Sequence, residues 1–212
     1  MTVCILGAGA FGTALAIALS ETHDIRLWGR NAEEMTKVET TRKNFKLPGP
    51  ILGAKIKITS DAQTAIQGTD FILSVVPLQP TLTILQSLVG YFEGRPLIGC
   101  SKGLDLTTGQ GGYSVLKASY PNGPIGLLTG PSFAADIARG LPTALTLASE
   151  DSQAVSNWQA QLSNDTLRLY VSHDPIGAEL GAALKNVIAI ACGATIGAGL
   201  GESARAALIT RG

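Results

Sequence analysis

The sequence predicts an α/β protein with a doubly wound, mainly parallel sheet, followed by the start of an all-helical second domain. Two observations carry this prediction: short apolar runs alternate with helical patterns along most of the chain, and only helical patterns follow them. The chain has 212 residues, 45% of them hydrophobic, with 16 basic and 16 acidic side chains. This length allows a sizeable buried core, and the balanced charge gives no basic surface for nucleic acid. We therefore expect a small-molecule ligand and no nucleic acid partner.

The first strand and helix enclose a glycine-rich turn, Gly7-Ala8-Gly9-Ala10-Phe11-Gly12. An apolar run precedes this turn and a small-residue helix follows it, which is the context that a G-x-G-x-x-G dinucleotide-binding turn requires. Gly7 allows the tight turn, Gly9 lets the backbone approach a pyrophosphate, and Gly12 allows the helix to pack close to the strand. The helix N-terminus then faces the phosphate charge. The first element is therefore typical of a Rossmann-type fold, and a glycine-rich turn without a ligand is the weaker alternative.

The remaining elements repeat the alternation. Apolar runs predict strands at 2–6, 25–28, 56–59, 70–75, 96–100, 125–128, 144–148 and 167–171. Helical patterns lie between most of them, at 11–20, 31–40, 61–67, 79–91, 111–119, 132–139 and 151–162. Strands that alternate with helices are joined by crossovers, which favours parallel pairing.

The pattern changes after Pro175. Residues 177–191 have the length and composition of a buried helix, and no strand follows. We place a domain boundary near 172–174, which gives a dinucleotide-binding domain at 1–173 and the beginning of a helical substrate-binding domain at 174–212. The chain reaches Gly212 within or at the end of a second helix. Because this is too little for a stable domain, we expect additional chain or a partner to complete it.

The second strand bears on which dinucleotide is bound. An acidic residue at its end binds the ribose 2′-hydroxyl of NAD, whereas a nearby arginine accommodates the 2′-phosphate of NADP. Here the strand ends in Gly29-Arg30 and has no carboxylate at its tip. This favours NADP (NADPH) and still permits NAD. The alternative is that Arg30 is a solvated residue beside Asn31, which caps the next helix.

Three predicted strands end in residues that can meet a ligand, because open α/β sheets bind ligands at the carboxyl ends of their strands. The segment that ends in Pro77 would pass under the cofactor. Lys102 follows the 96–100 strand beside a glycine, where it can meet a phosphate or a carbonyl group. The segment from Gly130 to Ala134 either offers backbone N–H groups and the Ser132 hydroxyl to an anion, or uses Ser132 to cap a helix.

Lys185 and Asn186 interrupt an otherwise apolar helix. Burying an unpaired ammonium is costly, so Lys185 should either extend to solvent or face a polar cleft. A lysine near a second cation has a lowered pKa and can transfer protons near neutral pH. The same interruption of the apolar stretch 182–200 argues against membrane insertion.

The three cysteines, Cys4, Cys100 and Cys192, are far apart and have no metal-ligand spacing. We interpret them as reduced, buried thiols of a cytoplasmic protein, and we expect no metal site. The N-terminus has no basic region followed by an apolar core and a cleavage site, so no signal peptide is indicated.

A family resemblance is carried by Gly7–Ala16, Leu27–Arg30, Val76–Gln79, Ser101–Leu104, Thr129–Ala134, Gly181–Val187 and Ala204–Gly212. In order and in register, these segments closely resemble bacterial-type NAD(P)-dependent glycerol-3-phosphate dehydrogenase. The resemblance implies an oxidoreductase that reversibly reduces dihydroxyacetone phosphate to sn-glycerol 3-phosphate with NAD(P)H and supplies glycerophospholipid synthesis. It also implies a cytoplasmic enzyme and, by analogy, a homodimer.

The resemblance assigns site residues position by position. The cofactor contacts that it implies are Gly7, Gly9, Ala10, Phe11, Gly12, Arg30, Pro77, Lys102 and Ala134. The substrate contacts that it implies are Lys102, Gly130, Ser132 and Lys185. Lys102 and Lys185 are the implied catalytic residues, and Lys185 matches the family's proton donor and acceptor. Hydride addition to a ketone leaves negative charge on oxygen, which two lysines would stabilise. We also expect repulsion between these lysines to lower the pKa of Lys185.

The chain departs from the family pattern at two positions: Ile196 replaces a usual aspartate, and Ser203 replaces a usual asparagine. The family's helical domain also continues beyond the Thr-Arg-Gly segment and contributes an aspartate and a Ser-Arg-Asn cluster to the substrate phosphate site. A protein that ends at Gly212 is therefore expected to bind dinucleotide but to catalyse poorly.

Two alternatives stay open from the sequence. One is an NADP(H)-binding module or sensor without turnover. The other is a different two-domain hydroxyacid dehydrogenase, against which the Gly130–Ala134 segment and Leu184-Lys185-Asn186 argue.

Overall fold

The computed structural model describes residues 1–211, and every predicted strand is present in it. The strands are β1 (Thr2–Leu6), β2 (Asp24–Trp28), β3 (Ile56–Thr59), β4 (Phe71–Ser74), β5 (Leu97–Gly99), β6 (Ile125–Thr129), β7 (Thr143–Ala148) and β8 (Leu167–Ser172). The helices are α1 (Ala10–Leu19), α2 (Ala32–Thr41), α3 (Ala62–Ile66), α4 (Leu78–Leu88), the short 3₁₀ helix η1 (Val89–Tyr91), α5 (Gly112–Ser119), α6 (Ala134–Ala138), α7 (Ser152–Leu162), α8 (Pro175–Gly197) and α9 (Gly201–Arg211).

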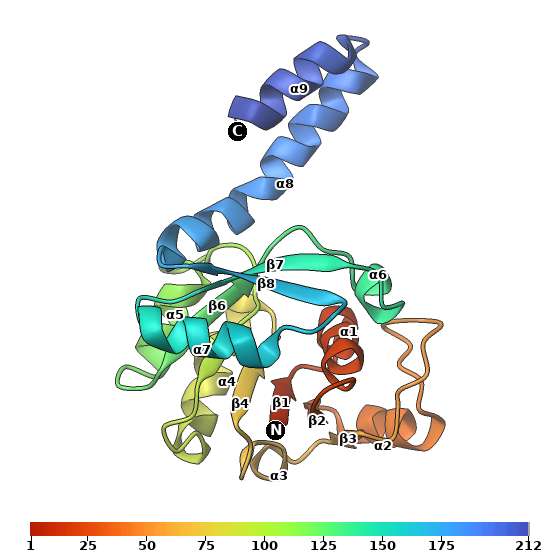
Figure 1. The fold of residues 1–212 in the computed structure, drawn as a ribbon, viewed down its shortest axis with the longest axis vertical. Helices are drawn as coiled ribbons and strands as arrows, with labels where there is room; N and C mark the ends of the chain where they lie inside the picture. Colours follow the sequence, from red (N-terminus) through yellow and green to blue (C-terminus); the bar gives the residue numbers. More distant parts are fainter. Residues whose placement is uncertain (212) are drawn as a thin grey trace.

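The strands form one sheet in the order β3-β2-β1-β4-β5-β6-β7-β8 (Figure 1). All neighbours pair in parallel except β6 and β7, so the predicted doubly wound, mainly parallel sheet is confirmed. The strand order reverses between β1 and β4, where chain connections leave in opposite directions. Leu6 pairs with both Trp28 and Ser74, so β1, β2 and β4 end at one level. A crevice at this switch point is where such sheets bind ligands.

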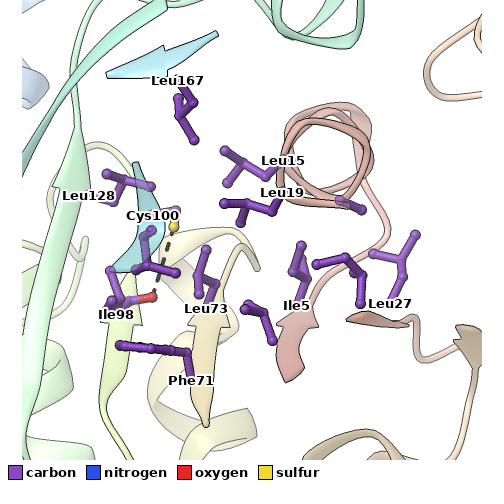
Figure 2. Packing of buried hydrophobic residues seen from close by; sticks show 14 of the residues in the cluster. Ile5, Leu15, Leu19, Leu27, Phe71, Leu73, Ile98, Cys100, Leu128 and Leu167 are labelled. Carbon is purple, nitrogen blue, oxygen red and sulfur yellow. Dashed lines mark hydrogen bonds between the residues drawn. The ribbon is translucent and has the colours of Figure 1, made fainter. Parts of the chain in front are cut away.

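Helices cover both faces of the sheet. Side chains of α1, α2 and α7 pack on one face, and side chains of α3, α4 and α5 pack on the other. Figure 2 shows Leu15 and Leu19 of α1 directed toward the strand residues Ile5 and Leu73. Each of these side chains is almost completely buried, and burial of one leucine or isoleucine contributes about 1.5–3 kcal/mol. This packing fixes the glycine-rich turn between β1 and α1.

Helices α8 and α9 form a hairpin that projects from the sheet (Figure 1). The expectation of a buried helix at 177–191 is wrong for the described residues, because Leu184, Val187 and Ile190 are exposed. The composition of α8 is that of a core helix, but within residues 1–211 its first half packs on α5, β6 and β7 and its second half packs on α9. Cys192, expected to be buried like Cys4 and Cys100, is half-buried for the same reason. The expected helix end at Gly212 lies outside the described residues.

By length and composition, α8 is also the one helix in residues 1–211 that is apolar enough to cross a membrane, with a mean hydropathy of 1.5 over its most apolar window. One such helix is weak evidence for a membrane protein. Lys185, in the middle of α8, lines a cavity together with residues from the sheet.

Candidate functional site

The first cavity of the candidate site lies at the switch point between β1 and β4. Its volume is about 560 Å³, and we call it the glycine-turn cavity. It is lined by Gly7–Gly12, Trp28, Gly29, Arg30, Asn31, Glu34, Met35, Lys46, Val75, Val76, Pro77, Pro80 and Ile84. Seven of the predicted cofactor residues therefore line one space: Gly7, Gly9, Ala10, Phe11, Gly12, Arg30 and Pro77.

The three glycines of the turn are required for three different reasons. Gly7 has a φ of +126°, and a Cβ there would lie 2.8 Å from the carbonyl atoms of Val75. A Cβ on Gly12 would collide with the carbonyl oxygen of Gly7, so α1 can approach β1 only with glycine at this position. A Cβ on Gly9 would meet nothing within 4 Å. The protein itself thus does not need a glycine at position 9, and the open space fits a ligand that approaches the backbone closely.

Asn44 holds the glycine-rich turn from a distant loop. Its Nδ2 donates to the carbonyl oxygen of Ala8 at 3.0 Å and to Oγ1 of Thr13 at 2.8 Å. The side chain is buried, so these hydrogen bonds fix the loop after α2 onto the wall of the cavity. No pattern around Asn44 in the sequence indicates this role.

Charged side chains gather at the β2 end of the cavity. Arg30 is exposed and lines it, while Asn31 caps α2 by accepting the N–H of Glu34 at 2.9 Å. The helix cap expected at Asn31 is therefore confirmed, and the role of Arg30 toward a 2′-phosphate stays a prediction. Lys46, which the sequence did not single out, also lines the cavity, and its Nζ lies 2.5 Å from Oε1 of Glu34. Two cations thus flank this end, one of them paired with a carboxylate.

The second cavity, of about 580 Å³, lies between the ends of β5 and β6 and helix α8, and we call it the lysine cavity. It is lined by Lys102, Thr129, Gly130, Pro131, Thr146, Ser172, Asp174, Gly177, Ala178, Gly181, Ala182 and Lys185. Lys102 comes from the loop after β5 and Lys185 from α8, so residues 83 positions apart in sequence meet in one space. Lys185 faces this cleft, as one of the two sequence-based alternatives expected.

Lys102 lines the lysine cavity and lies near one residue of the glycine-turn cavity. Its Nζ donates to the carbonyl oxygen of Gly130 at 3.2 Å and lies 6.0 Å from the ring centroid of Phe11, which lines the glycine-turn cavity. Partial burial, and next the nearby charge of Lys185, lower the pKa of Lys102 below its usual value. The charge of Lys185 thus acts on Lys102, whereas the effect expected from the sequence at Lys185 stays a prediction.

Two hydroxyl groups near the lysine cavity have no hydrogen-bond partner among the described residues. They are Oγ1 of Thr129 and Oγ of Ser132. The alternative that Ser132 caps a helix is wrong, because α6 begins at Ala134 with Phe133 at the N-cap and no side-chain cap. Since buried hydroxyls are normally paired, these two groups lack the hydrogen bond that such groups usually make.

The comparisons with known proteins agree with this geometry. The family model described as NAD-dependent glycerol-3-phosphate dehydrogenase N-terminus matches residues 2–155, and the corresponding C-terminus model matches residues 174–212. The chain belongs to the NAD-dependent glycerol-3-phosphate dehydrogenase family. The resemblance seen in the sequence motifs is therefore confirmed.

Individual relatives support the family assignment. The chain is 53% identical over 213 residues to glycerol-3-phosphate dehydrogenase [NAD(P)+] of Roseobacter denitrificans, and 50% identical over 213 residues to that of a Ruegeria strain. Each alignment covers 100% of this chain and 66% of the relative. The crystal structure of glycerol-3-phosphate dehydrogenase (gpsA) from Coxiella burnetii superposes with a TM-score of 0.87 at 32% identity, over 99% of this chain and 65% of that one. The chain thus spans slightly less than two thirds of the length of these relatives.

Two of the site residues implied by glycerol-3-phosphate dehydrogenase motifs line neither cavity. Ser132 and Ala134 follow Pro131, and Ala134 packs in the small apolar cluster that also contains Ala10 and Phe11. Their assigned contacts stay predictions. Conversely, Lys46 and Thr129 line the cavities although no role was assigned to them. Thr129 directly follows the predicted strand 125–128 and was detectable for that reason, whereas Lys46 lies in a loop without a recognisable pattern.

Proposed function

We propose that the protein to which this chain belongs reversibly reduces dihydroxyacetone phosphate to sn-glycerol 3-phosphate with NADPH or NADH. The observation that carries the proposal is the proximity of the two cavities: Nζ of Lys102, from the lysine cavity, lies 6.0 Å from the ring centroid of Phe11, from the glycine-turn cavity. A dinucleotide along the glycine-rich turn would end at Phe11, next to a space lined by two lysines. Cations in that position suit a phosphorylated ketone whose oxygen gains negative charge.

The glycine-turn cavity fits a nicotinamide dinucleotide, because its open space at Gly9 lies at the N-terminus of α1. When bound, the nicotinamide supplies or accepts the hydride. We assign preference to NADPH, since Arg30 and Lys46 line the end of the cavity near β2 and the strand ends at Trp28 without a carboxylate. Both cations suit a 2′-phosphate, and Glu34 balances only one of them.

The residues of the lysine cavity would have different roles in the reaction. Lys185 gives the proton to the substrate oxygen in reduction and takes it back in oxidation. Lys102, held by the carbonyl oxygen of Gly130, stabilises the developing charge on that oxygen. The hydroxyls of Thr129 and Ser132 donate to polar groups of the substrate. Each of these contributions strengthens in the transition state, as catalysis requires.

The wider assignments are proposals of the same kind. We assign residues 1–173 to the dinucleotide-binding domain and 174–212 to the helical substrate-binding domain. The buried thiols of Cys4 and Cys100 are consistent with a reducing, cytoplasmic location. A homodimer and a role in glycerophospholipid synthesis complete the proposal by analogy with the family.

The test is NADPH oxidation by the full-length protein on addition of dihydroxyacetone phosphate, compared with Lys185→Ala and with Lys57→Ala as control. Lys57 is an exposed lysine on β3 and lines neither cavity. Turnover that is lost only in Lys185→Ala supports the proposal. NADPH binding without turnover in the wild-type protein would instead favour a cofactor-binding module.

A further inference from the structure

We infer that Glu179 is a positioning residue, which fixes helix α8, and with it Lys185, against the loop that carries Lys102. The inference rests on the proposed function for the roles of the two lysines. The contact that defines it involves neither of them. It joins α8 to α5.

Glu179 differs from every other carboxylate in residues 1–211 by its burial. It is the only Asp or Glu there that is buried, with 6% of its surface exposed, and it forms no ion pair with another described residue. Its Oε2 accepts the backbone N–H of Tyr113 at 2.7 Å. Burying a carboxylate is costly unless its oxygens are satisfied, so this side chain is held where it is by a specific partner.

The partner is the buried N-terminus of helix α5. Helix α5 begins at Gly112, its N-cap Gly111 makes no side-chain cap hydrogen bond, and its first turn has no acidic residue. The first N–H groups of a helix have no partner within the helix, and negative charge there is favourable. Glu179 thus supplies from α8 the cap that α5 lacks.

The local sequence of α5 is adapted to this carboxylate. A Cβ on Gly111 would collide with the carboxyl group of Glu179, although the backbone at Gly111, with a φ of −83°, is one that any residue can adopt. The absence of a side chain at Gly111 thus leaves the space that the Glu179 carboxyl group occupies in this position.

Gly111 also closes the loop that carries Lys102. Leu104 pairs with Gly111 in an isolated antiparallel bridge, and the side chain of Gln79 holds the carbonyl oxygen of Leu104 at 3.0 Å and the N–H of Leu106 at 3.1 Å. Lys102 lies two residues before this bridge. A shift of α8 at Glu179 would therefore displace Gly111 and the end of the loop that carries Lys102.

The spacing along α8 sets the direction of Lys185. Six residues advance a helix by about 9 Å and separate the two side chains by about 120° around its axis. With Glu179 directed at α5, Lys185 is turned toward the lysine cavity, which it lines. One buried contact thus fixes both the position and the rotation of the helix that carries Lys185.

The experiment compares Glu179→Ala and Glu179→Gln in the full-length protein, with Glu150→Ala as control. Glu150 is an exposed glutamate that pairs with Lys117. The measured quantities are kcat, KM for dihydroxyacetone phosphate, Kd for NADPH, the pKa of Lys102 from NMR of methylated lysines, and hydrogen exchange at the Tyr113 amide.

In Glu179→Ala we expect kcat to fall at least tenfold, Kd for NADPH to stay within twofold, and Tyr113 exchange to accelerate about tenfold to a hundredfold, since a hydrogen bond to a charged group is lost. The pKa of Lys102 should rise, because Lys185 no longer holds its charge nearby. Glu179→Gln keeps an acceptor and should recover most of kcat. Glu150→Ala should match the wild type.

Two results would overturn the inference. One is an unchanged kcat and Lys102 pKa in Glu179→Ala despite faster Tyr113 exchange. The other is a loss of NADPH affinity and thermal stability in parallel with kcat, which is the signature of general unfolding. The two proposals fail on different measurements. If the wild-type protein shows no turnover, the proposed function is wrong. If Tyr113 exchange and the Lys102 pKa are both unchanged in Glu179→Ala, the positioning role of Glu179 is wrong.

Discussion

Replacing Gly9 with alanine tests the glycine-turn cavity, because the structure predicts that this change affects ligand binding and leaves the fold intact. Gly9 is the N-cap of α1, with φ −80° and ψ −177°, a conformation that alanine adopts without strain. The added methyl group would meet nothing within 4 Å. As an N-cap, alanine is less favourable than glycine and lowers the free energy of unfolding by about 0.5 kcal/mol. Alanine also reduces the conformational entropy of the unfolded chain, which raises the free energy of unfolding by about 0.4–1 kcal/mol. The free energy of unfolding should therefore change by no more than about 0.5 kcal/mol.

The effect on NADPH should be much larger. The methyl group enters the space proposed for the pyrophosphate and would disturb its hydrogen bonds to the backbone N–H groups. A hydrogen bond to a charged group is worth about 1.5–3 kcal/mol, so Kd should rise about tenfold to a hundredfold. Fluorescence titration with NADPH gives Kd, and thermal unfolding gives the stability.

Gly12→Ala is the matched comparison, since its Cβ collides with the carbonyl oxygen of Gly7 and not with ligand space. We expect this variant to lose several kcal/mol of stability, as overpacked backbone contacts do (about 1–3 kcal/mol or more). A Gly9→Ala protein that binds NADPH within twofold of the wild type, or that melts as low as Gly12→Ala, would refute the reasoning.

Three further outcomes are expected. Arg30→Ala and Lys46→Ala should each raise Kd for NADPH about tenfold and leave Kd for NADH nearly unchanged, because a 2′-phosphate loses a charged partner. Thr129→Val should raise KM for dihydroxyacetone phosphate about tenfold without lowering Tm, because the hydroxyl that it removes has no partner among the described residues. Lys185→Met should raise the pKa of Lys102, since a neighbouring positive charge is removed, and NMR titration measures that rise.

Each of these outcomes has a contrary result. Equal losses for NADH and NADPH would show that Arg30 and Lys46 do not recognise the 2′-phosphate. A lower Tm in Thr129→Val would mean that the hydroxyl contributes to the fold. If the Lys102 pKa stays constant in Lys185→Met, the two lysines do not interact electrostatically, and this would contradict the proposal that they share one site.

Local patterns in the sequence were sufficient for the sheet and for the glycine-rich turn. An apolar run of four or five residues must be buried, and a G-x-G-x-x-G turn between such a run and a helix is tightly constrained by space, as Gly7 and Gly12 demonstrate. The same holds for Lys102 and Lys185, which stand out because a cation beside buried elements needs a polar surrounding.

Contacts between distant segments could not be predicted in this way. Asn44 binds a carbonyl group 36 residues earlier, and Glu179 binds an N–H group 66 residues earlier. Nothing near either residue in sequence marks these contacts, since they arise only when the sheet has brought the segments together. The prediction that 177–191 is buried was wrong for a related reason. The apolar composition of α8 shows that the helix can pack against other apolar elements, but it does not show which elements within residues 1–211 lie next to it.

The place of Lys102 has a thermodynamic consequence. One ammonium group lies over the Phe11 ring of one cavity and forms part of the wall of the other. Any ligand that draws on its charge in the lysine cavity therefore alters the potential felt in the glycine-turn cavity. Linkage requires such coupling to be reciprocal, so that each ligand must change the affinity for the other by the same factor. We therefore expect the two proposed ligands to bind cooperatively, with Lys102 contributing to the coupling between them.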